Sequence, residues 1–232
     1  MPHAPVYLDC HATTPVDRRV LEVMLPFFAE DFGNPASSTH QWGWKAQAAV
    51  ESARRDVAAI IGASAREIVF TSGATESNNL AIRGAAEVLR PRRSHLVVSA
   101  VEHKSVIELA RHLETRGWQL TIVPVGRDGR VDLEALAGAV TGDTALVSVM
   151  AANNEIGVVQ PLAEIGAIAR TAGALFHVDA AQAIGKMPID AGAMSIDLLS
   201  LTAHKIHGLV RQGDLTGAAR LLPEERPYPA GW

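Results

Sequence analysis

The chain of 232 residues lacks features that mark several large classes of protein. Its single cysteine, Cys10, excludes a disulfide within one chain and makes a thiolate metal site unexpected, so we predict no bound metal. No apolar run approaches the roughly 20 residues that span a bilayer, and the N-terminus has no export-signal pattern. The net charge of −4 offers nucleic acid and anionic membranes no attraction. We therefore expect a cytoplasmic protein that binds neither nucleic acid nor membrane.

Two nucleotide-binding motifs are also missing. The sequence contains neither the G-x-x-x-x-G-K-[ST] loop nor the G-x-G-x-x-G turn, which disfavours a nucleotide-binding α/β protein. Lysine is scarce, since only four of the 21 basic residues are lysines. One of them, Lys205, follows an apolar run and stands between residues that could bind a ligand. A scarce lysine in such a place is either a solvated charge or a reactive amine.

Short apolar runs alternate with helical patterns from about residue 40 onward. This alternation predicts an α/β protein with a mostly parallel sheet that helices cover on both faces. In such sheets, ligands bind beyond the carboxyl ends of the strands. We expect strands over residues 67–71, 95–100, 120–125, 145–150, 175–178 and 196–201, and helices over residues 46–61, 76–89, 105–116 and 161–172.

Candidate ligand-binding residues follow the expected strands. The turn around Gly73 opens a helix, and its backbone N–H groups with the hydroxyl of Thr75 suit a phosphate. The same turn could equally be a helix cap made of small residues. His103 follows the second strand and could stack on a flat ring or cap a loop. Asn154 belongs to an asparagine pair, which is typical of a turn but could also bind a ring hydroxyl or a carboxylate.

Two further strand ends carry charged groups. Asp179 ends an apolar strand, where an unpaired carboxylate is unfavourable, so it either caps the next segment or faces a cation such as a protonated pyridine nitrogen. Lys205 follows the last strand, flanked by Thr202 and His204. A phosphate cradle, a stacking ring, a carboxylate and an amine together describe a pocket for pyridoxal 5′-phosphate (PLP).

The residues closely resemble the cysteine desulfurases, which are class V aminotransferase-like, fold-type I PLP enzymes. The resemblance implies a three-layer large domain over residues 16–208 after an N-terminal segment, 1–15. The small C-terminal domain would be largely missing, and residues 209–232 form a tail without the family pattern, as a shifted reading frame or a gene fragment would give. The matching segments are residues 7–15, 32–38, 70–77, 101–103, 153–157, 177–182 and 203–205.

The resemblance also implies roles for single residues. Lys205 would carry PLP and later move the α-proton of the substrate. His103 would stack on the ring, Asp179 would pair with the pyridine nitrogen, and Gln182 would contact the ring oxygen. Asn154 would help to hold cofactor and substrate.

The cofactor's phosphate would be held at two places. Ala74 would bind it through its backbone, and Thr75 through its hydroxyl. Thr202 and His204 would bind it from the other side. Thr202 stands where many relatives carry serine, which preserves the hydroxyl.

In this family, L-cysteine is converted to L-alanine and the sulfur passes to an enzyme cysteine as a persulfide. A sulfur acceptor, either an iron–sulfur scaffold or a tRNA thiolation relay, would then receive it. We expect a homodimer with weak or no activity, because the attacking cysteine belongs to the missing region and Cys10 matches a small buried hydrophobe better. Alternatives are a silent PLP-binding or dimerisation fragment and another class V enzyme such as selenocysteine lyase. An unpaired sheet edge and exposed apolar surface are further expectations.

Overall fold

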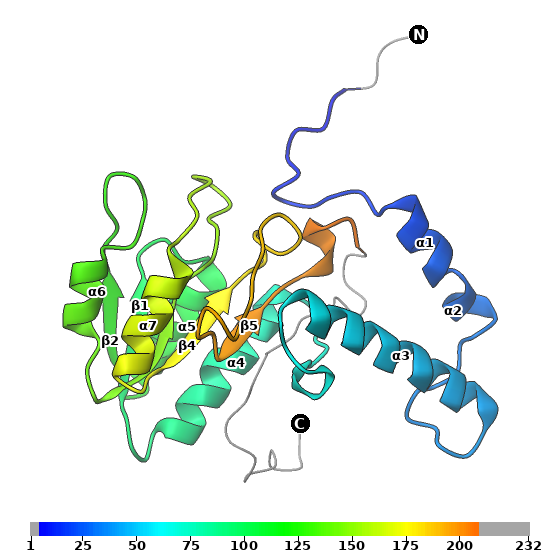
Figure 1. Cartoon of the computed structure of the whole chain (residues 1–232), viewed down its shortest axis with the longest axis horizontal. Coiled ribbons are helices and arrows are strands. Elements are labelled where there is room, and N and C mark those ends of the chain that lie inside the picture. The colour runs from blue at the N-terminus through cyan, green and yellow to red at the C-terminus, as the bar shows by residue number, and fades with distance from the viewer. Residues whose placement is uncertain (1–4, 209–232) are drawn as a thin grey trace.

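A computed structural model of the chain describes residues 5–208. Its centre is one sheet of five parallel strands in the order β2-β1-β3-β4-β5, which confirms the predicted parallel sheet (Figure 1). The tail predicted at residues 209–232 lies outside the described residues. The strands are β1 (His95–Ser99), β2 (Gln119–Val123), β3 (Thr144–Ser148), β4 (Leu175–Asp179) and β5 (Leu198–Ser200).

Helices cover both faces of the sheet, so the predicted three layers are present. Successive side chains of a strand point to opposite faces. In β1, Leu96 and Val98 therefore pack in one apolar cluster, and Val97 packs in the other. Helices α4 (Ala74–Leu89) and α5 (Lys104–Thr115) cover the first face. The C-terminal half of α3 (Gln41–Ile60), with α6 (Leu133–Ala139) and α7 (Leu162–Thr171), covers the second.

The prediction of a strand over residues 67–71 is wrong. A 3₁₀ turn, Ala65–Glu67, occupies its start, and the residues after it pair with no strand of the sheet. Arg54 of α3 supplies the missing interactions, since its guanidinium donates to the carbonyl of Ile68 and lies 4.8 Å from the centre of the Phe70 ring. A side chain thus replaces the neighbouring strand, while Ile68 stays buried in the core.

The N-terminal part of the chain extends away from this body. Figure 1 shows α1 (Arg18–Met24), α2 (Pro26–Ala29) and the start of α3 projecting to one side of the sheet, and neither α1 nor α2 has a buried residue. Cys10 is exposed in this part, so its predicted burial is wrong: the segment that carries it has no covering layer in residues 5–208. The exposed apolar side chains here include Phe27, Phe28, Phe32, Trp42 and Trp44.

None of the helices within residues 5–208 combines the length and apolar character that crossing a bilayer requires. At the sheet's end, β5 pairs with β4 on one side, and no other described strand pairs with it.

Candidate active site

A cavity of about 370 Å³ opens beyond the carboxyl ends of the strands. This volume lies within the range of small-molecule sites, and the position is the one parallel sheets use for ligands. All nine residues singled out in the sequence line it: Ala74, Thr75, His103, Asn154, Asp179, Gln182, Thr202, His204 and Lys205. A second cavity of similar volume lies at the amino ends of β4 and β5 and contains none of them.

One end of the cavity is the start of helix α4. Its N-cap, Gly73, has a φ of 151°, a conformation that favours glycine, and contributes no side-chain cap. The first amides of the helix, at Ala74 and Thr75, therefore face the cavity with the positive end of the helix dipole. The carboxylate of Glu76 accepts from the N–H of Ser72 (2.6 Å). The hydroxyl of Ser72, and then this N–H, lower the pKa of Glu76 by hydrogen bonding, and together they fix the turn. The start of α4 therefore favours the binding of an anion at this end of the cavity.

A buried carboxylate forms a second wall. Asp179, the last residue of β4, is only 4% exposed. Its Oδ1 accepts from the N–H of Ala181 (3.0 Å) and its Oδ2 from the amide of Asn78 (2.8 Å). Burial raises the pKa of Asp179, whereas these bonds and the charges of His103 and Lys205 oppose the rise. A cation placed against this carboxylate would be held strongly, because little water competes for it.

His103 has the predicted capping role, and its predicted stacking on a ring stays a prediction. It is the N-cap of α5, where its Nδ1 accepts from the N–H of Ser105 (3.2 Å), and it also lines the cavity. The two residues of the pair Asn153–Asn154 lie in different settings. Asn153 forms the turn, with its Oδ1 accepting from the N–H groups of Glu155 (2.7 Å) and Ile156 (3.0 Å), while Asn154 lines the cavity.

Lys205 lies in a 3₁₀ turn, Ala203–Lys205, directly after β5. Its amine donates to the carbonyl of His11, which also accepts from Nε2 of Gln182 (2.9 Å). The amine of Lys186 donates to Oε1 of the same glutamine (3.2 Å). Burial, and then the charge of Lys186, lower the pKa of Lys205, while Asp9 and Asp179 act against them. The lowered pKa increases the share of uncharged amine, which is the form that attacks carbonyl groups.

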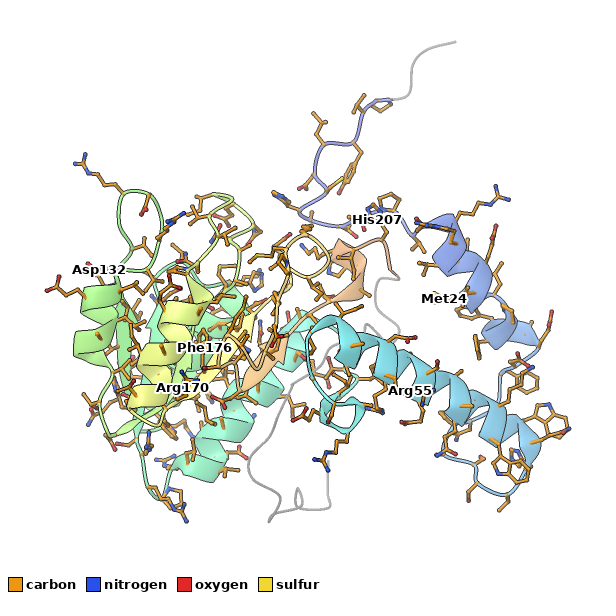
Figure 2. The ribbon with its side chains drawn as sticks, in the orientation of Figure 1. Met24, Arg55, Asp132, Arg170, Phe176 and His207 are labelled. Atoms are coloured by element: carbon orange, nitrogen blue, oxygen red, sulfur yellow. The ribbon has the colours of Figure 1, made fainter. Side chains whose placement is uncertain are left out.

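The N-terminal segment is tied to the residues around Lys205. The carbonyl of His204 accepts from both the N–H (3.0 Å) and the hydroxyl (2.9 Å) of Thr14. The N–H of His207 donates back to the same hydroxyl (2.8 Å), and the ring of His207 lies at this junction in Figure 2. These bonds fix the N-terminal segment next to His204, which lines the cavity.

These three features fit PLP. The cofactor carries a phosphate, a basic ring nitrogen and an aldehyde, and the cavity offers a helix N-terminus, a buried carboxylate and an amine of lowered pKa. Within the described residues, no cluster of three or more His, Cys, Asp or Glu side chains is placed to hold a metal ion.

Several residues near the site were not predicted. Asn78 is fully buried and joins Asp179 to Ser105, and buried Glu102 stands next to His103. For Asn78, the sequence offered one signal: a polar side chain on a helix face that is otherwise rich in alanine and isoleucine. Its partners, however, come from segments about 30 and 100 residues away, which no local pattern reveals.

Comparison with known proteins decides the family, because the sequence model of aminotransferase class-V matches residues 6–231. The chain belongs to the aminotransferase class-V family. Enzymes of this family use pyridoxal phosphate. The predicted family and cofactor class are thereby confirmed.

The similar curated proteins are cysteine desulfurases. The cysteine desulfurase IscS of Anaeromyxobacter sp. (strain Fw109-5) is 56% identical over 204 residues, which are 88% of this chain and 50% of the relative. The human cysteine desulfurase is 54% identical over 204 residues, 88% of this chain and 45% of the relative. The chain thus spans about half the length of the curated relatives it matches.

Solved structures agree with this likeness. A NifS-like protein superposes with a TM-score of 0.89 at 42% identity, covering 94% of this chain and 60% of that one. A structure of SspA in complex with cysteine gives a TM-score of 0.85 at 40% identity, covering 90% of this chain and 60% of that one. The class V enzyme fold of the described residues is therefore shown by structure as well as by sequence.

Proposed function

We propose that this chain binds PLP through Lys205 and carries the PLP-binding part of a cysteine desulfurase. The observation that supports this most is the position of Lys205, an amine of lowered pKa in the cavity that also contains Asp179 and the start of α4. Cysteine as substrate is supported by the likeness to cysteine desulfurases and by the neighbour solved with cysteine.

Each wall of the cavity would have its own task. PLP, when bound, supplies an electron sink for the α-carbon of an amino acid. Lys205 would attach the cofactor and then move a proton at the substrate α-carbon. Asp179 would hold the pyridine nitrogen in its protonated form, since a buried carboxylate stabilises an adjacent cation. His103 would stack on the ring, Gln182 would bind the ring oxygen, and Asn154 would orient cofactor and substrate.

The phosphate would lie at the start of α4. Ala74 and Thr75 line the cavity there, so the N–H of Ala74 and the hydroxyl of Thr75 would bind the phosphate, and the helix dipole favours its charge. Thr202 and His204, which line the same cavity, would complete its binding.

Sulfur transfer requires a thiolate that attacks the substrate sulfur and becomes a persulfide, while the amino acid leaves as alanine. Cys10, the single cysteine of the chain, is exposed and does not line the cavity. We therefore propose weak or no turnover of L-cysteine by the 232-residue chain alone. A sulfur-acceptor protein and a homodimeric state stay predictions for the whole protein, made from the resemblance to cysteine desulfurases. The cytoplasmic location stays a prediction, because one similar relative is mitochondrial.

Cofactor attachment tests the proposal directly. The purified chain should gain a visible absorbance band on addition of PLP, and borohydride should then fix the cofactor on the peptide that contains Lys205. Lys205→Ala should lose both signals, whereas Lys104→Ala, which removes an exposed lysine at the start of α5, should keep them. Attachment to another lysine, or no attachment by the folded chain, would refute the proposal.

A further inference from the structure

A chain of hydrogen bonds, buried at Asp179 and partly buried at His103, joins these two residues. The amide nitrogen of Asn78 donates to Oδ2 of Asp179 (2.8 Å) and to Oγ of Ser105 (3.0 Å). The same Oγ lies 2.8 Å from Nδ1 of His103. The four residues come from the end of β4, the first turns of α4 and the start of α5. These hydrogen bonds therefore connect three elements of the fold.

The direction of these bonds follows from what each group can donate. An ionised Asp179 only accepts, so Asn78 must turn its NH₂ group toward it, and both amide protons are then used. Because Ser105 Oγ accepts one of them, its own hydroxyl proton is available for Nδ1 of His103. The backbone N–H of Ser105 also donates to Nδ1 (3.2 Å). With two donors directed at Nδ1, a neutral His103 carries its proton on Nε2.

We propose that Asn78 and Ser105 are positioning residues that set the ring orientation and the Nε2–H tautomer of His103 and link them to Asp179. The importance of this relay for catalysis rests on the proposed function, in which both end residues face PLP. Neither Asn78 nor Ser105 lines the cavity, so each acts only through its hydrogen-bonded neighbours.

The burial of Asn78 supports a specific task. Its side chain is fully buried, and its Oδ1 has no hydrogen-bond partner in the described part of the chain. An unpaired buried acceptor is unfavourable, and an apolar residue of similar size would avoid it. The amide is therefore best explained by what its nitrogen joins, namely Asp179 and Ser105.

Nitrogen-15 NMR of the histidine rings in the cofactor-free 232-residue chain tests the relay. His103, assigned by the signal lost in His103→Gln, should show the Nε2–H tautomer. Ser105→Ala removes one of the two donors to Nδ1 of His103 and should shift the resonance of that nitrogen. Ser105→Thr keeps a hydroxyl and should restore the wild-type resonance. His177 contacts none of these residues through its ring and serves as the internal control for folding.

A second variant separates a relay from a local contact. Asn78→Ala should shift the His103 Nδ1 resonance in the same direction as Ser105→Ala, by a smaller amount, because hydrogen bonds in a chain polarise one another. If Asn78→Ala loses the His177 signal and so does not fold, Asp179→Ala interrupts the same chain at its other end. A wild-type His103 with its proton on Nδ1, or a His103 signal unmoved by any folded variant of Asn78 or Asp179, would overturn the proposal.

Cofactor binding gives an independent measurement. Ser105→Ala should weaken PLP binding about fivefold, the effect of one lost hydrogen bond, with rescue by Ser105→Thr. Failure of the wild type to bind PLP would reject the proposed function while the NMR result still decides on the relay. If the wild-type chain binds PLP but the His103 resonances do not change in the folded variants, the relay is rejected and the proposed function is kept.

Discussion

Glu102 and Met150 are joined by a hydrogen bond of 2.6 Å from the N–H of Met150 to Oε1 of Glu102. The bond connects the segment after β3 to the loop that carries His103. The hydroxyl of Ser99 donates to the same oxygen (2.6 Å), whereas Oε2 has no partner within residues 5–208. Burial raises the pKa of Glu102 to about 8, although both hydrogen bonds oppose the rise. At neutral pH this side chain is therefore a carboxylic acid that holds two strand ends together.

The raised pKa of Glu102 predicts a pH-dependent stability. Between its ordinary value of 4.5 and about 8, the folded chain keeps a proton that the unfolded chain releases. The stabilisation is fully present below the lower value and falls, by about 1.4 kcal/mol per pH unit, as the pH rises to the higher one. The difference in the free energy of unfolding between the wild type and Glu102→Gln, measured by urea unfolding across this range, should fall with this slope as the pH rises.

The control for this prediction is Glu108→Gln, which changes an exposed carboxylate of α5. It should leave the slope at its wild-type value. A Glu102→Gln variant with the same pH dependence as the wild type would mean that the carboxyl group ionises normally in the folded chain.

His177 predicts the opposite trend in acid. Its ring lies between the hydroxyls of Ser148 (2.8 Å) and Ser200 (3.0 Å), and burial lowers its pKa to about 3. Below its ordinary pKa of 6.5 the unfolded chain binds a proton at this ring that the folded chain does not. The contribution of His177 to the free energy of unfolding therefore decreases as the pH falls from 6.5 toward 3, and above pH 4.5 it opposes the contribution of Glu102. His177→Gln, although less stable at neutral pH, should lose less stability over this range. His112→Gln, an exposed histidine of α5, should follow the wild type.

Lys186 predicts a change in the reactivity of Lys205. Burial is the larger cause of the lowered pKa of Lys205, and the positive charge of Lys186 is the next. Lys186→Met removes that charge, so the pKa of Lys205 should rise and less of its amine should be uncharged at neutral pH. Mass spectrometry should then find slower labelling of Lys205 by an amine-reactive reagent in the cofactor-free chain. Lys45→Met, on exposed α3, should not change the rate.

The sequence predicted most of the sheet well because β1, β3, β4 and β5 are buried on both faces, whereas β2 is partly exposed. Strand β4 and helix α7 fall within one residue of their expected limits, since apolar runs and flanking glycines mark them locally. The helix α6 was missed because it spans only seven residues, and the false strand at residues 67–71 has strand-like composition but is satisfied by Arg54. Composition indicates burial, but it does not identify the partner.

The candidate site divides in the same way. The nine predicted residues that line it follow strand ends or open a helix, so the rule for parallel sheets brings them to one edge. The relay through Asn78 and Ser105 depends on how α4, α5 and β4 lie against one another, which no spacing in the sequence encodes. Cys10 was misjudged because burial was inferred from residue type alone, whereas its segment lies in solvent.

The exposed apolar side chains of α2 and α3 predict self-association. Phe28 is 61% exposed and Trp42 is 52% exposed, and both lie in the part of the chain that projects from the sheet. Apolar side chains grouped on a surface gain free energy when a second surface covers them, at about 25 cal/mol per Å². Sedimentation velocity should therefore show a mean mass that rises with concentration, and Phe28→Ser combined with Trp42→Ser should reduce this rise. Ile156→Ser removes an apolar side chain of similar exposure (54%) from the loop between β3 and α7 and should leave the association unchanged. A concentration-independent monomer in the wild type would show that these side chains do not drive contact between copies.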